Sequence, residues 1–161
     1  MKLRKLFVLS AFVVACASSA PTNFAGTYTL TTTENANDCS LPNWTQGSST
    51  TFTASFTQDG TNAQITVQGA VGLLLAAYVG TATFQGTVSG NTFTSEFIGQ
   101  KSASEGACTY TINLGISASL DSNSVISGTI TLTPVTNNDP SCGSKNACKN
   151  TDTVSGNRTG P

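Results

Sequence analysis

The sequence of 161 residues contains no histidine, and charged residues make up only 9% of it. Without histidine, a Ser-His-Asp triad is excluded, and a cysteine nucleophile would lack its usual base. A zinc site is disfavoured as well, because no two cysteines have the CxxC spacing. No glycine-rich phosphate loop precedes a helical segment. We therefore expect a protein that is not an enzyme and holds no metal or cofactor.

Pairs of carboxylates are the remaining way to supply an acid and a base. The candidates are Glu34 with Asp38, and Glu96 with Glu105. Side chains of this kind are usually exposed to solvent. We interpret them as surface charges.

The N-terminal segment has the composition of an export signal. Lys2, Arg4 and Lys5 are followed by the mostly apolar residues 6–15. This run has the length of a signal-peptide core and is too short to span a membrane. We expect residues 1–15 to be a signal peptide and the protein to be exported from the cytoplasm of a bacterium.

The segment Val13-Val14-Ala15-Cys16 resembles the lipobox of bacterial lipoproteins, which are cleaved before the cysteine and acylated on it. The resemblance implies a lipid on Cys16, with residues 16–25 as a flexible linker. The residue after the cysteine is Ala17, which resembles the residue at this position in Gram-negative lipoproteins of the outer membrane. The resemblance implies a protein in the outer membrane that faces the periplasm or the exterior. Ordinary cleavage after Ala20, and secretion, is the alternative.

Cleavage before Cys16 would leave four cations against eight carboxylates, a net charge of about −4. Four scattered cations form no basic patch, which argues against nucleic-acid binding. An anionic membrane surface would not attract the chain either. The expected contact with the membrane is therefore through the lipid.

From Gly26 onward, apolar and polar residues alternate as they do in strands with one face in a core. The alternating segments predict about eight strands: 26–33, 51–57, 62–67, 82–88, 93–97, 108–120, 126–132 and 151–158. They follow one another mostly through short turns such as Asp59-Gly60. This order predicts an all-β fold, an antiparallel up-and-down meander closed into an eight-stranded barrel over residues 26–161. A β-sandwich is the alternative.

Gly26-Thr27-Tyr28, at the start of the first predicted strand, is similar to the Gly-x-Trp that opens lipocalin-like (calycin) barrels, with Tyr28 in place of the tryptophan. The meander over residues 26–158 extends the likeness. The resemblance implies the same kind of barrel.

In such a meander, successive connections alternate between the two ends of the barrel. The tight turns at 59–60, 89–91 and 121–124 would lie at one end. The long connections would lie at the other end: 34–50, 69–80, 99–107 and 134–150. The cysteines expected in the mature domain lie in or beside the long connections. We therefore expect the disulfides to link the loops at a single, open end of the barrel.

Cys39, Cys108, Cys142 and Cys148 predict two disulfides in an exported chain. Three pairings are possible. Cys142–Cys148 with Cys39–Cys108 is preferred, because the first two cysteines are close in sequence. The interlocked alternatives join Cys108 to Cys142 or to Cys148.

Two features of the expected open end are candidates for binding. One is the apolar segment 69–80, and the other is the single tryptophan, Trp44. The large side chains of the segment are Leu73, Leu74, Leu75 and Tyr78. The segment is either a buried strand or short helix that plugs the barrel, or an apolar lip, lid or partner surface. Trp44 either packs over the barrel mouth or contributes to binding.

These observations favour a membrane-anchored binding protein, with a small apolar ligand in the barrel or a protein partner at the open-end loops. The alternatives are a structural surface lipoprotein with a filled barrel, and a protease-inhibitor module. Six phenylalanines and three tyrosines follow the signal, enough to fill an eight-stranded barrel if most point inward. An interior cavity therefore distinguishes the first two functions. We also expect the anchor at the tight-turn end, so that the open end faces away from the membrane.

Overall fold

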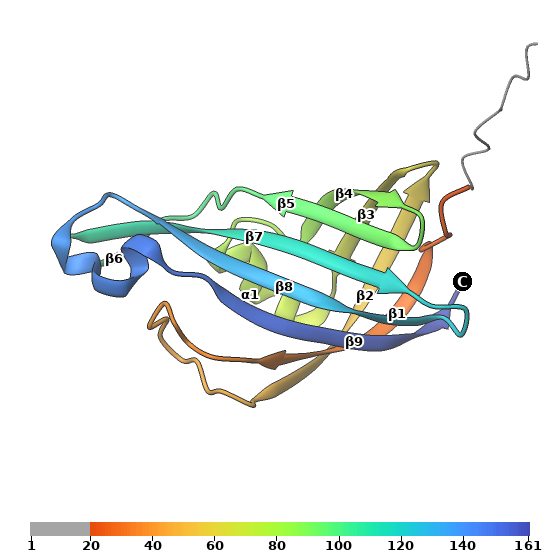
Figure 1. The fold of residues 1–161 in the computed structure, drawn as a ribbon, viewed down its shortest axis with the longest axis horizontal. Coiled ribbons are helices and arrows are strands. Elements are labelled where there is room, and N and C mark those ends of the chain that lie inside the picture. Colours follow the sequence, from red (N-terminus) through yellow and green to blue (C-terminus); the bar gives the residue numbers. More distant parts are fainter. Residues whose placement is uncertain (1–19) are drawn as a thin grey trace, which may run out of the picture.

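The computed structural model describes residues 20–161 (Figure 1). The predicted signal peptide and Cys16 lie outside these residues. Within them, no helix is both long enough and apolar enough to cross a membrane.

Residues 20–161 form nine strands and two helices. In chain order these are β1 (Gly26–Glu34), β2 (Ser49–Asp59), β3 (Asn62–Val67), α1 (Gly69–Tyr78), β4 (Thr83–Ser89), β5 (Thr92–Phe97), β6 (Ala103–Glu105), β7 (Cys108–Leu120), β8 (Val125–Thr136), the 3-10 helix η1 (Pro140–Ala147) and β9 (Asn150–Gly160).

The strands form one antiparallel sheet in the order β5-β4-β3-β2-β1-β9-β8-β7-β6, and β5 also pairs with β7. This last pairing closes eight of the strands in the described range into a barrel. β6 pairs with β7 outside the closed ring. The predicted eight-stranded meander is thus confirmed, and the β-sandwich alternative is wrong.

Aromatic side chains fill the end of the barrel with the tight turns, which we call the closed end. Phe56 lies 5.4 Å from Tyr28 and 5.3 Å from Phe93, between ring centroids. Arg158 covers this cluster: its Nε donates to the Tyr28 hydroxyl at 2.9 Å, and its guanidinium lies 5.3 Å from the ring centroid. Aromatic edge contacts and the cation over the ring stabilise this closure.

The two ends differ as the alternation of connections predicts. Figure 1 shows the β7–β8 turn and the C-terminus at the closed end, with β6 and η1 at the other, open end. Thr22 donates from its backbone to Gly90 in the β4–β5 turn, so the chain enters the barrel at the closed end too. The segment 69–80 contains a helix and adds no strand, which preserves the alternation.

Two disulfides form at the open end, Cys39–Cys148 and Cys108–Cys142. The prediction of two bridges is confirmed, but the preferred pairing, Cys142–Cys148 with Cys39–Cys108, is wrong. Cys142 lies within η1 and Cys148 directly follows it, and Cys142 packs with Cys108 and Tyr110 on β7. Closeness in sequence therefore does not bring those two sulfurs together.

The loop that carries Cys39 is held by a fully buried asparagine at the start of β9. Asn150 Oδ1 accepts the Cys39 backbone N–H at 2.9 Å, and Asn150 Nδ2 donates to Asn37 Oδ1 at 2.9 Å. Buried polar groups that are satisfied in this way fix one arrangement of the backbone. The first disulfide and Asn150 together hold the 35–48 loop against β9.

A buried lysine connects three loops of the same end. Lys145 Nζ lies 3.1 Å from Glu105 Oε2 and donates to the Ser40 carbonyl at 3.4 Å. The Tyr110 hydroxyl donates to Glu105 Oε1 at 2.9 Å. Burial, with the Glu105 carboxylate, raises the pKa of Tyr110 to about 12, so this hydroxyl keeps its proton. The open-end loops are thus rigidly joined.

Candidate functional site

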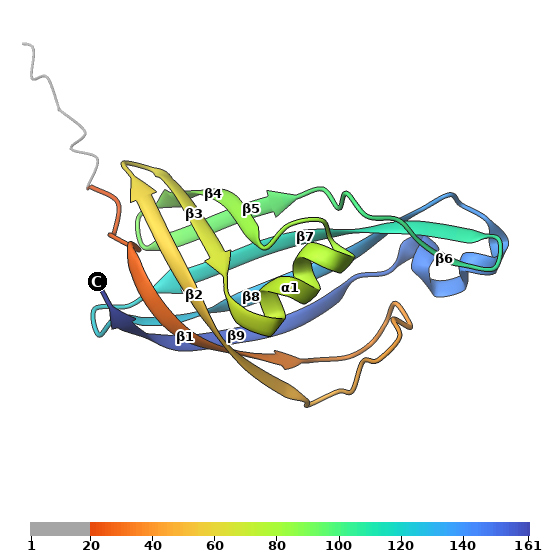
Figure 2. The ribbon, with the colours of Figure 1, turned by 180° about the vertical axis from the view of Figure 1, so that it is seen from behind.

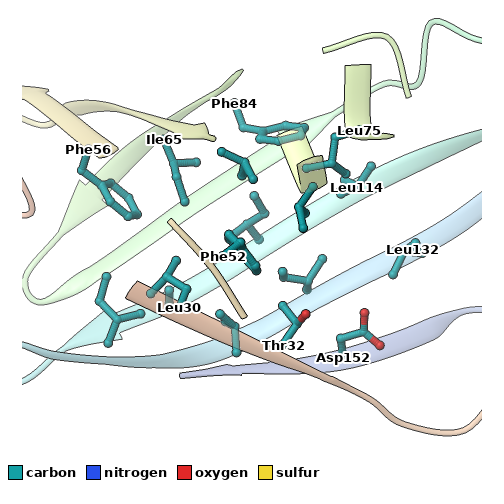
Figure 3. Close-up of a pocket in the computed structure, with 17 residues that line it drawn as sticks. Leu30, Thr32, Phe52, Phe56, Ile65, Leu75, Phe84, Leu114, Leu132 and Asp152 are labelled. Atoms are coloured by element: carbon teal, nitrogen blue, oxygen red, sulfur yellow. The ribbon is translucent and has the colours of Figure 1, made fainter. Parts of the chain in front are cut away.

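A cavity of about 150 Å³ lies inside the barrel, between the aromatic cluster and α1 (Figure 3). Seventeen residues line it, and among these described residues all but Thr32 and Asp152 are apolar. Leu30 and Phe52 come from β1 and β2, while Leu114 and Leu132 come from β7 and β8. An apolar hollow of this kind is the common form of a small-molecule site.

Three of the six phenylalanines in residues 20–161 cluster at the closed end, and the cavity lies next to them. Phe24, Phe56 and Phe93 pack together at the closed end, with centroids 5.3–6.2 Å apart. Toward the open end, the inward positions of β7 and β8 carry shorter aliphatic side chains such as Ile116 and Ile130. These side chains do not fill the barrel.

The helix α1 covers the cavity. In Figure 2, α1 lies in front of β7 and β8, whose residues form another wall of the same hollow. Val71 and Leu75 of α1 point into it. The helix approaches β3 closely at Gly72, where a Cβ would stand 2.3 Å from the Val67 carbonyl oxygen. Any larger residue at this position would push α1 off the barrel.

The predicted site residues of the segment 69–80 divide between two surfaces. Leu75 lines the cavity. Leu73, Leu74 and Tyr78 instead face solvent, with 75%, 55% and 68% of their surface exposed. The segment is therefore a cover on one side and an exposed apolar surface on the other.

Trp44 lies at the same end but belongs to its own loop. Its indole Nε1 donates to the Asn35 carbonyl at 2.8 Å, and the side chain is half-buried. It is not among the described residues that line the cavity. The structure does not bring Trp44 into the ligand space with Leu75.

The carboxylates considered as acid–base pairs do not form such pairs. Glu34 Oε2 accepts the Thr45 backbone N–H at 2.7 Å, and Asp38 is exposed. Glu96 lies opposite Gly115 on β7. Glu105 instead pairs with Cys108 at the start of β7, where it bonds Tyr110 and Lys145. In residues 20–161, no three cysteine or acidic side chains lie close enough to hold a metal ion.

The residue that sequence reasoning missed is Asp152 on β9. Its carboxylate lines the cavity, and its Oδ1 is buried with no hydrogen-bond partner in the described part of the chain. Burial raises the pKa of Asp152 from 3.8 to about 6, the Glu34 carboxylate adds to the rise, and a hydrogen bond from the Asn35 backbone opposes it. The signal was present: in a strand, Asp152 shares the inward face of Val154.

No protein family model, curated protein or solved structure matches this chain. The geometry of the cavity therefore carries the functional argument.

The Asp152→Asn variant is expected to be more stable than the native chain above pH 6. The folded state raises the pKa of this acid, so it binds more protons than the unfolded state between pH 4 and 6. Stability therefore falls as the pH rises through this window. Because the side chain is partly exposed to solvent, the full shift is discounted. We expect the free energy of unfolding of Asp152→Asn to exceed that of the native chain by about 1–2 kcal/mol at pH 8, and most of this difference to disappear at pH 4.

Urea unfolding at both pH values measures this gain. Asp59→Asn is the control, because it removes the same charge from an exposed position at the end of β2, at the closed end. A variant at position 152 that is less stable than the native chain at pH 8 would contradict the placement of the carboxylate.

Proposed function

We propose that the protein is a non-catalytic binding protein that holds a small apolar ligand inside its barrel. The observation that carries the proposal is the apolar cavity of about 150 Å³ beneath α1. Cavities of about this volume lined by Leu, Ile and Phe stay dry and bind benzene-sized molecules. The cavity argues against a structural protein with a filled barrel.

The proposed setting is the cell envelope, with the chain anchored by a lipid on Cys16. Two disulfides support export, because such bridges persist in oxidising compartments. The chain enters the barrel at the closed end, where Thr22 bonds the β4–β5 turn. An anchor preceding that point would leave the open end, with α1, facing away from the membrane.

A protein partner at the open end is the second candidate. Leu73, Leu74 and Tyr78 expose apolar surface on α1, and Ile98 in the nearby β5–β6 connection is 76% exposed. The Gln100 backbone N–H donates to the Val79 carbonyl at 2.8 Å, which holds this connection beside the end of α1. Clustered apolar surface of this kind often marks a contact site.

Calorimetric titration with ethylbenzene tests the ligand proposal. We expect binding with a Kd on the order of 0.1–1 mM, typical of a small hydrocarbon with few contacting atoms. Ile130→Trp should weaken binding at least tenfold, because residue 130 lines the cavity. Thr129→Trp is the matched control, since its side chain faces outward on the same strand, and binding should stay within twofold. Equal affinity in the two tryptophan variants would place the probe outside the barrel.

A further inference from the structure

The polar atoms of the cavity lie at one edge, on two neighbouring strands. Glu34 and Thr32 on β1 pair with Asp152 and Val154 on β9, so Thr32 and Asp152 are diagonal neighbours on the inner face. Figure 3 shows both side chains on the same side of the hollow. A ligand in the cavity would meet hydrocarbon everywhere except at this edge.

This edge offers acceptors. The Thr32 hydroxyl donates to the Thr50 carbonyl at 3.5 Å, which leaves its oxygen lone pairs free to accept. Asp152 Oδ1 is a buried acceptor without a donor in the described range. Apart from Thr32, no described lining residue carries an N–H or O–H on its side chain. Buried polar atoms are nearly always paired, and a ligand that carries an N–H donor would satisfy this oxygen.

The charge around this edge is negative. Glu34 is the cross-strand partner of Asp152, and its carboxylate disfavours a second negative charge there. No cationic side chain lines the cavity among the described residues. Lys145 is engaged with Glu105, and Arg158 with Tyr28 at the closed end. A ligand carboxylate would therefore be repelled, whereas a cation would be attracted.

We propose that the ligand is a small apolar amine, an inference that rests on the proposed function. Its ammonium group donates to Asp152 Oδ1 and to the Thr32 hydroxyl oxygen, while its hydrocarbon part fills the space between α1, β7 and β8. A charge-assisted hydrogen bond of this kind is stronger than a neutral one. The apolar walls fix the size of the ligand, and Asp152 fixes its chemistry.

Amine binding should depend on pH, because the ammonium group needs the ionised carboxylate. Burial sets the pKa of Asp152 at about 6. Glu34 on β1 is the ionisable side chain opposite it, while the β8 positions beside it, Ile130 and Leu132, do not titrate. The α1 residues that line the cavity, Val71 and Leu75, do not titrate either. Affinity for an amine should fall about tenfold between pH 8 and pH 5.

Three probes of similar size test the inference on the full chain: benzylamine, ethylbenzene and phenylacetate. Asp152→Asn should lower the affinity for benzylamine at least tenfold and leave the affinity for ethylbenzene within threefold. Asp59→Asn, which removes a charge at the closed end, should change neither. Phenylacetate should bind at least tenfold more weakly than benzylamine. The pH series on the native chain provides the same test without any substitution.

The outcomes separate the two proposals. Ethylbenzene binding with a benzylamine affinity that neither pH nor Asp152→Asn changes would overturn the amine inference and leave the ligand cavity standing. Absence of binding by both ethylbenzene and benzylamine would overturn both. A loss of benzylamine affinity in Asp152→Asn alone would support the assignment of the amine to Asp152.

Discussion

Replacing Cys39 and Cys148 together by alanine is expected to lower the free energy of unfolding by about 4–5 kcal/mol. The bridge joins positions 109 residues apart, so its loss frees a large loop in the unfolded state. Replacing Cys108 and Cys142, which are 34 residues apart, should cost about 1 kcal/mol less, because loop entropy grows with the logarithm of length. Urea unfolding of both variants without reductant measures the difference.

The same pair of variants tests the pairing itself. If the bridges are Cys39–Cys148 and Cys108–Cys142, each double variant leaves one intact disulfide and no free thiol besides that of Cys16, which the proposed lipid would block. Two free thiols in either variant, or a larger loss of stability on removing the 34-residue link, would contradict the arrangement of the open end.

Phe56→Ala should be the most damaging single truncation at the closed end, and should lower the free energy of unfolding by about 3–5 kcal/mol. Phe56 is 4% exposed and packs against Phe24, Tyr28 and Phe93. The lost ring would leave a void that these neighbours cannot fill. Because Phe56 also lines the cavity, the void would extend the ligand space toward the closed end.

Thermal or urea unfolding measures this cost, and Phe97→Ala is the matched control. Phe97 is half-buried, and within residues 20–161 it has one close aromatic neighbour, Phe84, at 5.5 Å. Its truncation should cost clearly less than that of Phe56. Equal costs at the two positions would show that the closed end is not the tightly packed part of the barrel.

The barrel could be predicted from the sequence because its strands have a simple signature. Period-two alternation marks which residues face the core, and the tight turns show that neighbouring strands pair in order. The short strand β6 gave no such signal: its three residues, Ala103–Glu105, are all exposed. It forms because the turn at Gly106 folds the chain back onto β7.

The helix α1 could not be identified from its sequence. The residues of Gly69–Tyr78 are apolar on every side, so they show neither the helical period nor the strand period. Packing against the barrel selects the helix, because a helix places Val71 and Leu75 on the cavity while Leu73 and Leu74 remain in solvent. The disulfide pairing could not be predicted either, because it depends on the packing of Cys142 against Cys108 and Tyr110 on β7, which are distant in sequence.

The candidate site was partly accessible to sequence reasoning. The segment 69–80 was identified, and Leu75 lies on the cavity. Asp152 was passed over because acidic residues are usually on the surface. Its position two residues before Val154 on β9 places it inside the barrel. A charged residue on the inward face of a predicted strand is the signal that sequence reasoning should have followed.

Whether the barrel holds an open apolar cavity can be seen by diffraction from crystals of the protein under xenon pressure, because xenon enters empty apolar cavities of about this volume. We expect a bound xenon atom inside the barrel, among Leu75, Leu114 and Ile130. A barrel interior without xenon, with these three side chains packed against one another, would contradict it.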